Sequence, residues 1–284
     1  MATAALIARN PDGSILYDTS KSIYGLIKSG PVEFAETWRR TQPTGGPHIY
    51  YDNIYKFVVK NAISPIVFVT GACNQSIVSK EGDNTVFYFA GQVADIKVYC
   101  FDLMAPIFTG PALKTRAKDG SFTFNSLQQP LNIIGTSTAP PPPQAEDQWG
   151  TPFPFGGGVG YYRVVVPQYD VGGSYLGGYP EYGFIYQLDP SKTYAAYIPW
   201  SRGCFFQNPL PAGQNLMRGG LHEGCYGLQG MIVHNMWISP ESTYGRILQF
   251  PGTPSGTWGV ATDRVPQCPY IDVSEYQYPF DPPR

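Results

Sequence analysis

Glycine and proline interrupt this chain throughout its length and limit the secondary structure that it can form. The 284 residues include 32 Gly and 28 Pro. Glycine loses more backbone entropy in a helix than any other residue, and proline lacks an N–H donor and clashes with the preceding turn. Hydrophobic residues make up 43% of the chain, which is enough apolar surface for a sizeable core. We therefore predict a mainly β fold with little helix.

The charge pattern disfavours several classes of partner. The chain has 19 basic and 21 acidic residues, a formal charge of −2 and no basic block. Nucleic-acid binders carry a basic footprint, so we predict no nucleic-acid partner. No run approaches the roughly 18 continuous apolar residues of a spanning helix, so we predict no membrane span. The N-terminal residues lack the basic flank of a secretory signal peptide, and we expect none.

The cysteines do not form a pattern typical of a disulfide framework. They are odd in number and widely spaced: Cys73, Cys100, Cys204, Cys225 and Cys268. Disulfide-rich secreted domains have an even number of cysteines at short spacings. We therefore predict synthesis in a reducing cytoplasm and buried free thiols that pack as small hydrophobic side chains.

A proline-rich segment divides the sequence near its middle. Residues 139–144 read Ala-Pro-Pro-Pro-Pro-Gln, which favours extended polyproline II and a semi-rigid spacer. We place a linker at 136–154 and predict two β-sandwich-like domains, at 1–135 and 155–284. The second region holds 14 of the 21 tyrosines but only one lysine, so the two regions differ in character.

Turn sequences and alternating apolar residues predict the strands of the first region. Two short apolar runs, 5–9 and 14–17, flank Asn-Pro-Asp-Gly at 10–13 and form a predicted hairpin. Residues 95–101 alternate, and two faces are predicted: Ile96, Val98 and Cys100 on one, and Lys97, Tyr99 and Phe101 on the other. Further strands are predicted at 55–60, 66–70, 86–89, 121–124 and 131–134. Residues 32–40 are compatible with a helix or a surface strand.

A short pattern occurs twice in the first region. Residues 12–20 and 119–126 share Asp-Gly-Ser, then alternating apolar residues, then Asp or Asn followed by a hydroxyl residue. We interpret these segments as two similar hairpin exits, in which polar side chains bond the backbone where a strand ends. Two copies do not make a solenoid.

These segments resemble small tail proteins of long-tailed bacteriophages. Residues 6–13, followed by Tyr-Asp-Thr-Ser at 17–20 and Tyr-Gly-Leu-Ile at 24–27, are similar to the start of such proteins. Residues 120–134 are similar to a "Gly, strand, Asp-Ser, Pro-Leu" ending, although Asn125 stands where that pattern has Asp. The resemblance covers about residues 1–135. It implies a virion protein of the tail tip or baseplate, assembled in the host cytoplasm, with no enzyme site in this part.

One set of residues in the second region has metal-ligand chemistry. His222 and Cys225 lie close together in the sequence, and Cys204 with His234 would complete a tetrahedral set. The spacing matches no zinc signature, because those signatures pair both ends closely. We therefore predict separate packed side chains, with no metal and no cofactor.

Phage tails often carry hydrolases, and carboxylates of the second region could supply the catalytic pair of a glycosidase. A glycosidase needs two carboxyl groups about 5 to 9.5 Å apart. The candidates are Asp170, Glu181, Asp189, Glu223, Asp263, Asp272 and Glu275. Neither a nucleophile elbow nor an H-E-x-x-H motif occurs, and three histidines leave few general bases. We predict that the chain is not an enzyme, with a tail-borne glycan or cell-wall hydrolase as the alternative.

Tyrosine and glycine alternate through the start of the second region. Tyrosine offers a large contact area at low entropy cost, and its mixture with glycine is typical of adaptable recognition loops. Tyrosines also pack β cores and subunit interfaces. The predicted partner-binding residues are Tyr169, Tyr175, Tyr179, Tyr182, Tyr186 and Trp200.

Together these features predict a bacteriophage virion structural protein of the tail tip or baseplate. The first domain is expected to attach to other tail proteins, and the second to contact subunits or a host surface receptor. Symmetric copies, with a trimer favoured, would strengthen weak single contacts through effective concentration. A purely structural tail plug or collar is a second alternative.

Overall fold

The computed structural model describes most of the chain in segments. These are 7–9, 11–13, 15–18, 21–39, 51–91, 96–139, 161–169, 175–208, 217–238, 256–258 and 264–283. Apart from the 3-10 turn η3 (Val273–Glu275), every regular element in these segments is a strand. The prediction of a mainly β protein is confirmed. Among the same residues there is no helix of the length and hydrophobicity needed to cross a membrane.

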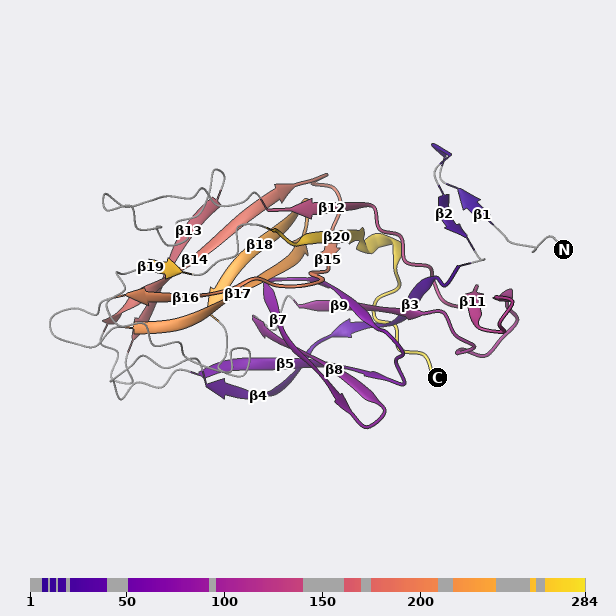
Figure 1. Cartoon of the computed structure of the whole chain (residues 1–284), viewed down its shortest axis with the longest axis horizontal. Helices are drawn as coiled ribbons and strands as arrows, with labels where there is room; N and C mark the ends of the chain where they lie inside the picture. Colours follow the sequence, from indigo (N-terminus) through magenta and orange to yellow (C-terminus); the bar gives the residue numbers. More distant parts are fainter. Residues whose placement is uncertain are drawn as a thin grey trace.

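The described residues form twenty strands, which follow one another along the chain (Figure 1). The first twelve are β1 (Ile7–Arg9), β2 (Ile15–Asp18), β3 (Tyr24–Pro31), β4 (Glu33–Arg39), β5 (Tyr51–Lys60), β6 (Ile66–Thr70), β7 (Cys73–Glu81), β8 (Asn84–Gly91), β9 (Lys97–Leu103), β10 (Lys114–Arg116), β11 (Phe122–Asn125) and β12 (Gly135–Thr138). The others are β13 (Tyr161–Tyr169), β14 (Tyr175–Gln187), β15 (Tyr194–Ala196), β16 (Gly203–Asn208), β17 (Met217–Leu228), β18 (Met231–Ile238), β19 (Gly256–Trp258) and β20 (Gln267–Asp272).

Two sheets pack face to face in the manner of a β-sandwich. The smaller sheet has the order β4-β5-β8-β7, with antiparallel pairing throughout. The larger sheet runs β12-β20-β15-β6-β17-β18-β14-β13, with β9 and β3 added beside β6, and β16 and β19 beside β17. Apolar side chains of both sheets form one core, which includes Phe57 and Phe89 from the small sheet and Val67, Val98 and Tyr226 from the large one.

A second core lies on the opposite face of β9 and β6. Phe68, Tyr99 and Phe101 pack there with Ile271 and Tyr276 from the C-terminal part of the chain. The alternation predicted for 95–101 is confirmed, because Val98 and Cys100 point to the first core and their neighbours to the second. Strand β9 is therefore buried on both faces.

The large sheet crosses the predicted domain boundary, and the prediction of two separate domains is corrected. Strand β6, from the first region, pairs with β15 at Val69 and with β17 at Thr70, and both partners belong to the second region. Strand β12 lies where the linker was predicted and pairs with β20. The two regions therefore share one sheet and one core. Residues 140–160, with the four prolines, lie outside the described residues.

Most of the predicted strands of the first region are present. The predicted hairpin around residues 10–13 is β1–β2. Residues 32–40, which are compatible with a helix or a surface strand by sequence, contain strand β4. The prediction at 131–134 is wrong, since the strand there is β12, which begins at Gly135. Gly135 packs closely against Tyr270, since a Cβ on this glycine would lie 2.3 Å from the tyrosine hydroxyl.

Candidate functional site

Two cross-strand pairs bring cysteine and histidine side chains together inside the large sheet. Cys225 of β17 lies directly opposite His234 of β18. Ser137 of β12 lies directly opposite Cys268 of β20. Directly opposite residues project from the same face of a sheet. Polar atoms of the two pairs meet, although β12 and β20 are separated from β17 and β18 in the strand order.

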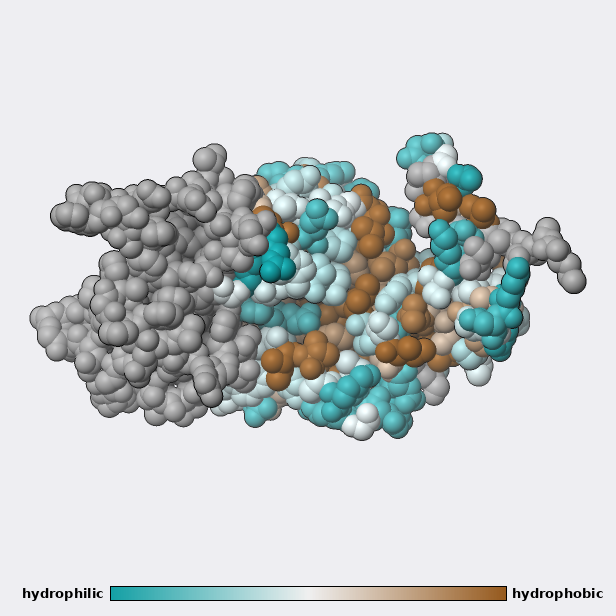
Figure 2. Space-filling view, viewed as in Figure 1, coloured by the Kyte–Doolittle hydropathy of each residue, from teal (hydrophilic) through white to brown (hydrophobic). Residues whose placement is uncertain are grey.

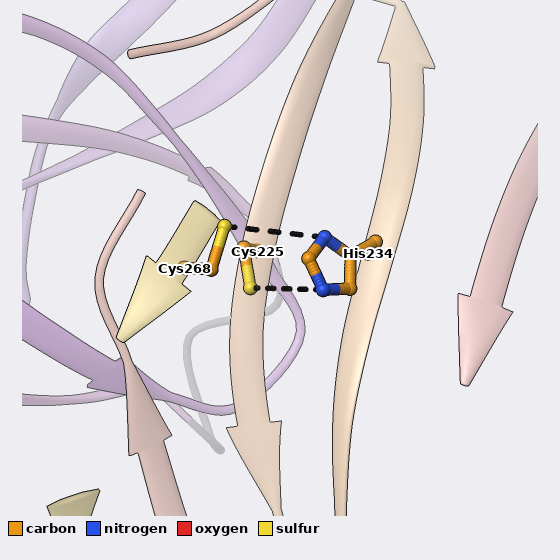
Figure 3. Close-up of side chains that lie close together, drawn as sticks. All are labelled: Cys225, His234 and Cys268. Atoms are coloured by element: carbon orange, nitrogen blue, oxygen red, sulfur yellow. Dashed lines mark hydrogen bonds between the residues drawn. The ribbon is translucent and has the colours of Figure 1, made fainter. Parts of the chain in front are cut away.

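The imidazole of His234 stands at the centre of these contacts (Figure 3). Its Nε2 lies 2.9 Å from Ser137 Oγ and 4.0 Å from Cys225 Sγ, and its Nδ1 lies 3.9 Å from Cys268 Sγ. The Ser137 hydroxyl donates to the Cys268 carbonyl oxygen at 3.3 Å. With its proton used in this way, the hydroxyl accepts from His234 in the tautomer that carries the proton on Nε2.

All four side chains are withdrawn from water. The most exposed of the four residues is Cys225, at 3%. Burial raises the pKa of the Cys225 thiol well above its usual value. A hydrogen bond from Cys225, followed in size by one from His234, lowers the pKa of Cys268 although burial opposes this. The site therefore combines one protonated thiol with a sulfur that favours the thiolate.

We name Cys225, His234 and Cys268 the Cys/His cluster. Their donor atoms, two thiol sulfurs and one ring nitrogen, all lie within 4.8 Å of one another. Apolar side chains pack around them, among them Ile232 and Tyr270. Thiolate and imidazole are ligands for soft and borderline metal ions. The cluster thus has the chemistry of a metal site in a dry environment.

Two of the four predicted metal-like residues, Cys225 and His234, lie together in the structure, and a further residue, Cys268, joins them. His222 lies elsewhere: its Nε2 donates to the Gln75 carbonyl oxygen at 3.0 Å, which ties β17 to the small sheet. Burial lowers the pKa of His222, so this imidazole is held in its neutral form. The side chain of Cys204 lies outside the described residues.

The carboxylate at the centre of the second region has a structural role. Glu223 is buried, and Arg202 donates to it twice, from Nε to Oε2 at 2.8 Å and from Nη2 to Oε1 at 2.7 Å. Such a bidentate pair satisfies both charges in a low-dielectric interior. Both oxygens of this hydrolase candidate are therefore engaged with Arg202.

Other carboxylates among the hydrolase candidates accept hydrogen bonds, two of them within turns. Asp272 accepts from Ser274 N at the start of η3 and pairs with Lys192 at 2.9 Å. Asp189 accepts from the N–H and the hydroxyl of Ser191. Glu275 accepts from an asparagine side chain at 3.0 Å. Asp170 and Asp263 lie outside the described residues, as does the side chain of Glu181.

The tyrosine-rich segment forms long strands instead of the loops and short strands expected. Strands β13 and β14 pair from Tyr161 opposite Phe184 to Tyr169 opposite Tyr175. The side chains of Tyr169, Tyr175, Tyr179 and Tyr182 lie outside the described residues. Tyr186 is 37% exposed, with its ring 6.5 Å from that of Tyr270, and Trp200 is 40% exposed beside Arg264.

Two hairpins at one end of the molecule have the same backbone design. In β1–β2, Ile7, Ala8 and Arg9 pair with Asp18, Tyr17 and Ile15. In β10–β11, Lys114, Thr115 and Arg116 pair with Asn125, Phe124 and Phe122. Both ladders shift register at the arginine, and each arginine donates to a glycine carbonyl in its own turn. Gly13 and Gly120 have φ of +86° and +87°.

The likeness continues beyond the hairpins. Lys21 N donates to the Asp18 carbonyl, and the equivalent Gln128 N donates to the Asn125 carbonyl. The segments that follow then pair with each other, since Leu26 N bonds Gln129 O and Leu131 N bonds Tyr24 O. The pattern that occurs twice in the sequence is therefore a structural repeat. The segments that follow its two copies are hydrogen-bonded to each other.

The two hairpins differ in what covers them. In β11, Phe124 is 5% exposed and Asn125 is fully buried against the segment after β9. In β1–β2, Ile7 and Ile15 are 45% and 53% exposed. Figure 1 shows β1 and β2 standing apart from the two large sheets, and Figure 2 shows hydrophobic surface on this hairpin.

Comparison of the chain with protein-family models, with curated proteins and with solved structures gives no match in any of the three.

Proposed function

We propose that the chain is a structural protein of a bacteriophage tail tip or baseplate, and that hairpin β1–β2 attaches it to a neighbouring tail subunit. One observation carries the proposal: the same hairpin is built twice, packed by its own chain in one copy and projecting in the other. The projecting copy carries two exposed apolar side chains, Ile7 on β1 and Ile15 on β2. Exposed apolar side chains of this kind suit a protein interface.

The resemblance of residues 1–135 to phage tail proteins supplies the class of partner. A neighbouring subunit would cover the exposed isoleucines of β1–β2 with an apolar surface of its own, as the segment at Met104 covers β11. Tail tips are built from symmetric copies, so a second copy of this chain is the first partner to test, with a trimer expected.

Contact with the host is assigned to exposed aromatic side chains of the second region. Tyr186 and Trp200 are exposed; Tyr186 lies on β14, which carries part of the tyrosine-rich segment, and Trp200 lies between β15 and β16. Tyrosine and tryptophan supply large rigid contact area, and they are enriched where interfaces are strongest. Several weak contacts of this kind become firm attachment when many copies act together.

The test of attachment is Ile15→Asp in a phage genome that encodes this chain. The side chain is exposed, so folding of the purified chain is expected to change little. The chain should be lost from purified particles, measured by mass spectrometry, or the particles should fail to assemble. Ile63→Asp is the matched control, because Ile63 is 64% exposed on the body of the protein. Wild-type particles without the chain, or Ile15→Asp particles with a full complement of it, would contradict the proposal.

The test of host contact is Tyr186→Ala combined with Trp200→Ala. We expect intact particles that adsorb to host cells at least several-fold less well, with Phe34→Ala as an exposed aromatic control. Failure of assembly in the double variant would instead indicate a purely structural plug or collar. Deleting residues 150–284 would not separate these roles, because it removes strands from a sheet that both regions share.

A further inference from the structure

We propose that the Cys/His cluster binds one zinc ion. Cys225 and Cys268 supply thiolates, and His234 supplies a ring nitrogen. The inference is independent of the phage-tail proposal, because it rests on donor atoms and their surroundings alone.

The separations within the cluster are close to those of a zinc site. Zinc lies about 2.3 Å from cysteine sulfur and about 2.0 Å from histidine nitrogen, so neighbouring ligands around a tetrahedral ion lie roughly 3.5 to 3.8 Å apart. Cys268 Sγ lies 3.9 Å from His234 Nδ1, Cys225 Sγ lies 4.0 Å from His234 Nε2, and the donor atoms of the three residues all lie within 4.8 Å of one another. Binding would bring Cys225 Sγ from the Nε2 side of the ring towards Nδ1, so that both sulfurs approach the same nitrogen. A water molecule in the fourth position would complete the coordination, as in other sites with three protein ligands.

The hydrogen bond to Ser137 has the character of support for a metal ligand. Metal-binding histidines commonly donate their second ring N–H to a polar group, which fixes the tautomer and the ring orientation. Ser137 Oγ lies 2.9 Å from His234 Nε2, and its own proton is directed to a carbonyl oxygen. Zinc on Nδ1, the nitrogen that faces Cys268, would select the tautomer with the proton on Nε2.

Charge selects a divalent ion. Two thiolates, a neutral imidazole and Zn²⁺ sum to zero, whereas a monovalent ion such as Cu⁺ would leave a net negative charge in an apolar core. An unpaired buried charge is costly. Glu223, the acidic residue next to this part of β17, is already neutralised by Arg202.

The position of the cluster gives the ion a structural task. In the sheet order, β20 and β12 are separated from β17 and β18 by β15 and β6. An ion held by Cys268 on one side and by Cys225 and His234 on the other would cross-link parts of the sheet that are not neighbours in the ladder. The ion would thus stabilise the packing of these strands around the core.

The direct test is metal analysis of the tag-free full chain after equilibration with Zn²⁺ under reducing conditions and removal of unbound metal. We expect about one zinc per chain in the wild type and its loss in Cys268→Ala. Cys100→Ala is the matched control, because Cys100 is equally buried but packs in the core between the two sheets. This variant should retain the ion.

Cobalt provides a readout that does not depend on stability. Co²⁺ in place of Zn²⁺ should give intense ligand-field and thiolate charge-transfer absorption in the wild type and in Cys100→Ala, and should lose both in Cys268→Ala. If Cys268→Ala does not fold, the wild type alone remains decisive: added Zn²⁺ should displace Co²⁺ and raise the melting temperature by several degrees. The proposal is overturned if the folded, reduced wild type binds no metal, if Cys268→Ala keeps the cobalt spectrum, or if Cys225 and Cys268 are recovered as a disulfide.

Discussion

Hairpins β1–β2 and β10–β11 have one backbone design and opposite surroundings. Each has an arginine at its register shift, a glycine with positive φ in its turn and the same backbone bond after its second strand. Asn125 of the second hairpin is fully buried, whereas Ile15 of the first is 53% exposed. Turn chemistry is local and repeats with the sequence, but burial depends on what the rest of the chain places beside each hairpin.

The residue that ends each hairpin shows how the difference is encoded. Asn125 Nδ2 donates to the carbonyl oxygens of Ala105 and Ile107, and its Oδ1 accepts from Leu127 N. Asp18 occupies the equivalent place and is half-buried. An ionised carboxylate only accepts, so it cannot replace the asparagine amide against two carbonyls. One amide in place of a carboxylate therefore suits the second hairpin to an interior position.

The largest effect is expected from Asn125→Asp, which makes the second hairpin resemble the first. It removes two donors and buries a charge next to two carbonyl oxygens, so we expect a loss of about 3 to 5 kcal/mol at neutral pH. Burial should raise the pKa of the new carboxyl above its unfolded value, so the loss should shrink as the pH falls towards that value. Urea unfolding at several pH values measures both effects.

The reciprocal change, Asp18→Asn, is the control for this prediction. It alters a half-buried position of a projecting hairpin, and we expect less than about 1 kcal/mol. Equal losses of unfolding free energy in Asn125→Asp and Asp18→Asn would show that the two hairpins have similar surroundings as well as the same backbone design.

The turn glycines should separate global from local stability. Gly120→Ala and Gly13→Ala each force alanine into a left-handed conformation, and a Cβ at either position has no atom within 4 Å. The local cost is therefore backbone strain of about 1 to 2 kcal/mol in both. We expect Gly120→Ala to lower the global unfolding midpoint, and Gly13→Ala to change only amide exchange in β1–β2. A fall in the global midpoint for Gly13→Ala would indicate that the first hairpin is also part of the core.

The arginines should give a smaller difference. Arg116 donates to Gly120 O at 2.6 Å, and its guanidinium lies 3.6 Å from the ring centroid of Phe122. Arg9 donates to Gly13 O at 2.8 Å but lies opposite Ile15, which has no ring. We expect Arg116→Ala to cost about 0.5 to 1 kcal/mol through its cation–π contact, and Arg9→Ala to cost less. Thermal unfolding of the two variants side by side tests which arginine contributes more stability. The stacking of Arg116 on Phe122 predicts a larger loss for Arg116→Ala, and equal melting temperatures would refute this.

The smallest effect concerns the charge of the second turn. The hydroxyl of Ser121, and then its N–H, lower the pKa of Asp119. A carboxyl whose pKa is depressed on folding stabilises the fold above its unfolded pKa, and this contribution disappears as the pH falls through the folded pKa. Ser121→Ala should raise the pKa of Asp119 towards its usual value, which NMR titration of the carboxyl carbon measures. An unchanged titration would assign the shift to another group.

Local patterns predicted much of the first region and part of the candidate site. The two faces of 95–101 and the hairpin at 10–13 follow from alternation and turn chemistry, which act over a few residues. Cys225 and His234 are paired across the short connection between β17 and β18. Cys268 had no comparable signal, because it is far along the chain and reaches the cluster only when β20 joins the sheet that contains β17 and β18.

The domain boundary shows the limit of composition as evidence. Proline density and the distribution of tyrosine and lysine indicated two domains, yet Val69 and Thr70 pair with strands of the second region. Composition reports on the local backbone and solvent preference of a segment. It carries no information about which distant strand will complete a sheet.

The sequence by itself determined the β character of this protein, its tight turns and the repeated hairpin, because glycine, proline and alternating apolar residues act on backbone conformation within a few residues. Only the tertiary structure decided that both regions share one sheet, that one hairpin is buried while its copy projects, and that Ser137, Cys225, His234 and Cys268 meet. These outcomes depend on long-range strand pairing and on which apolar faces cover one another. Such contacts form between residues far apart in the chain, where no local pattern specifies the partner.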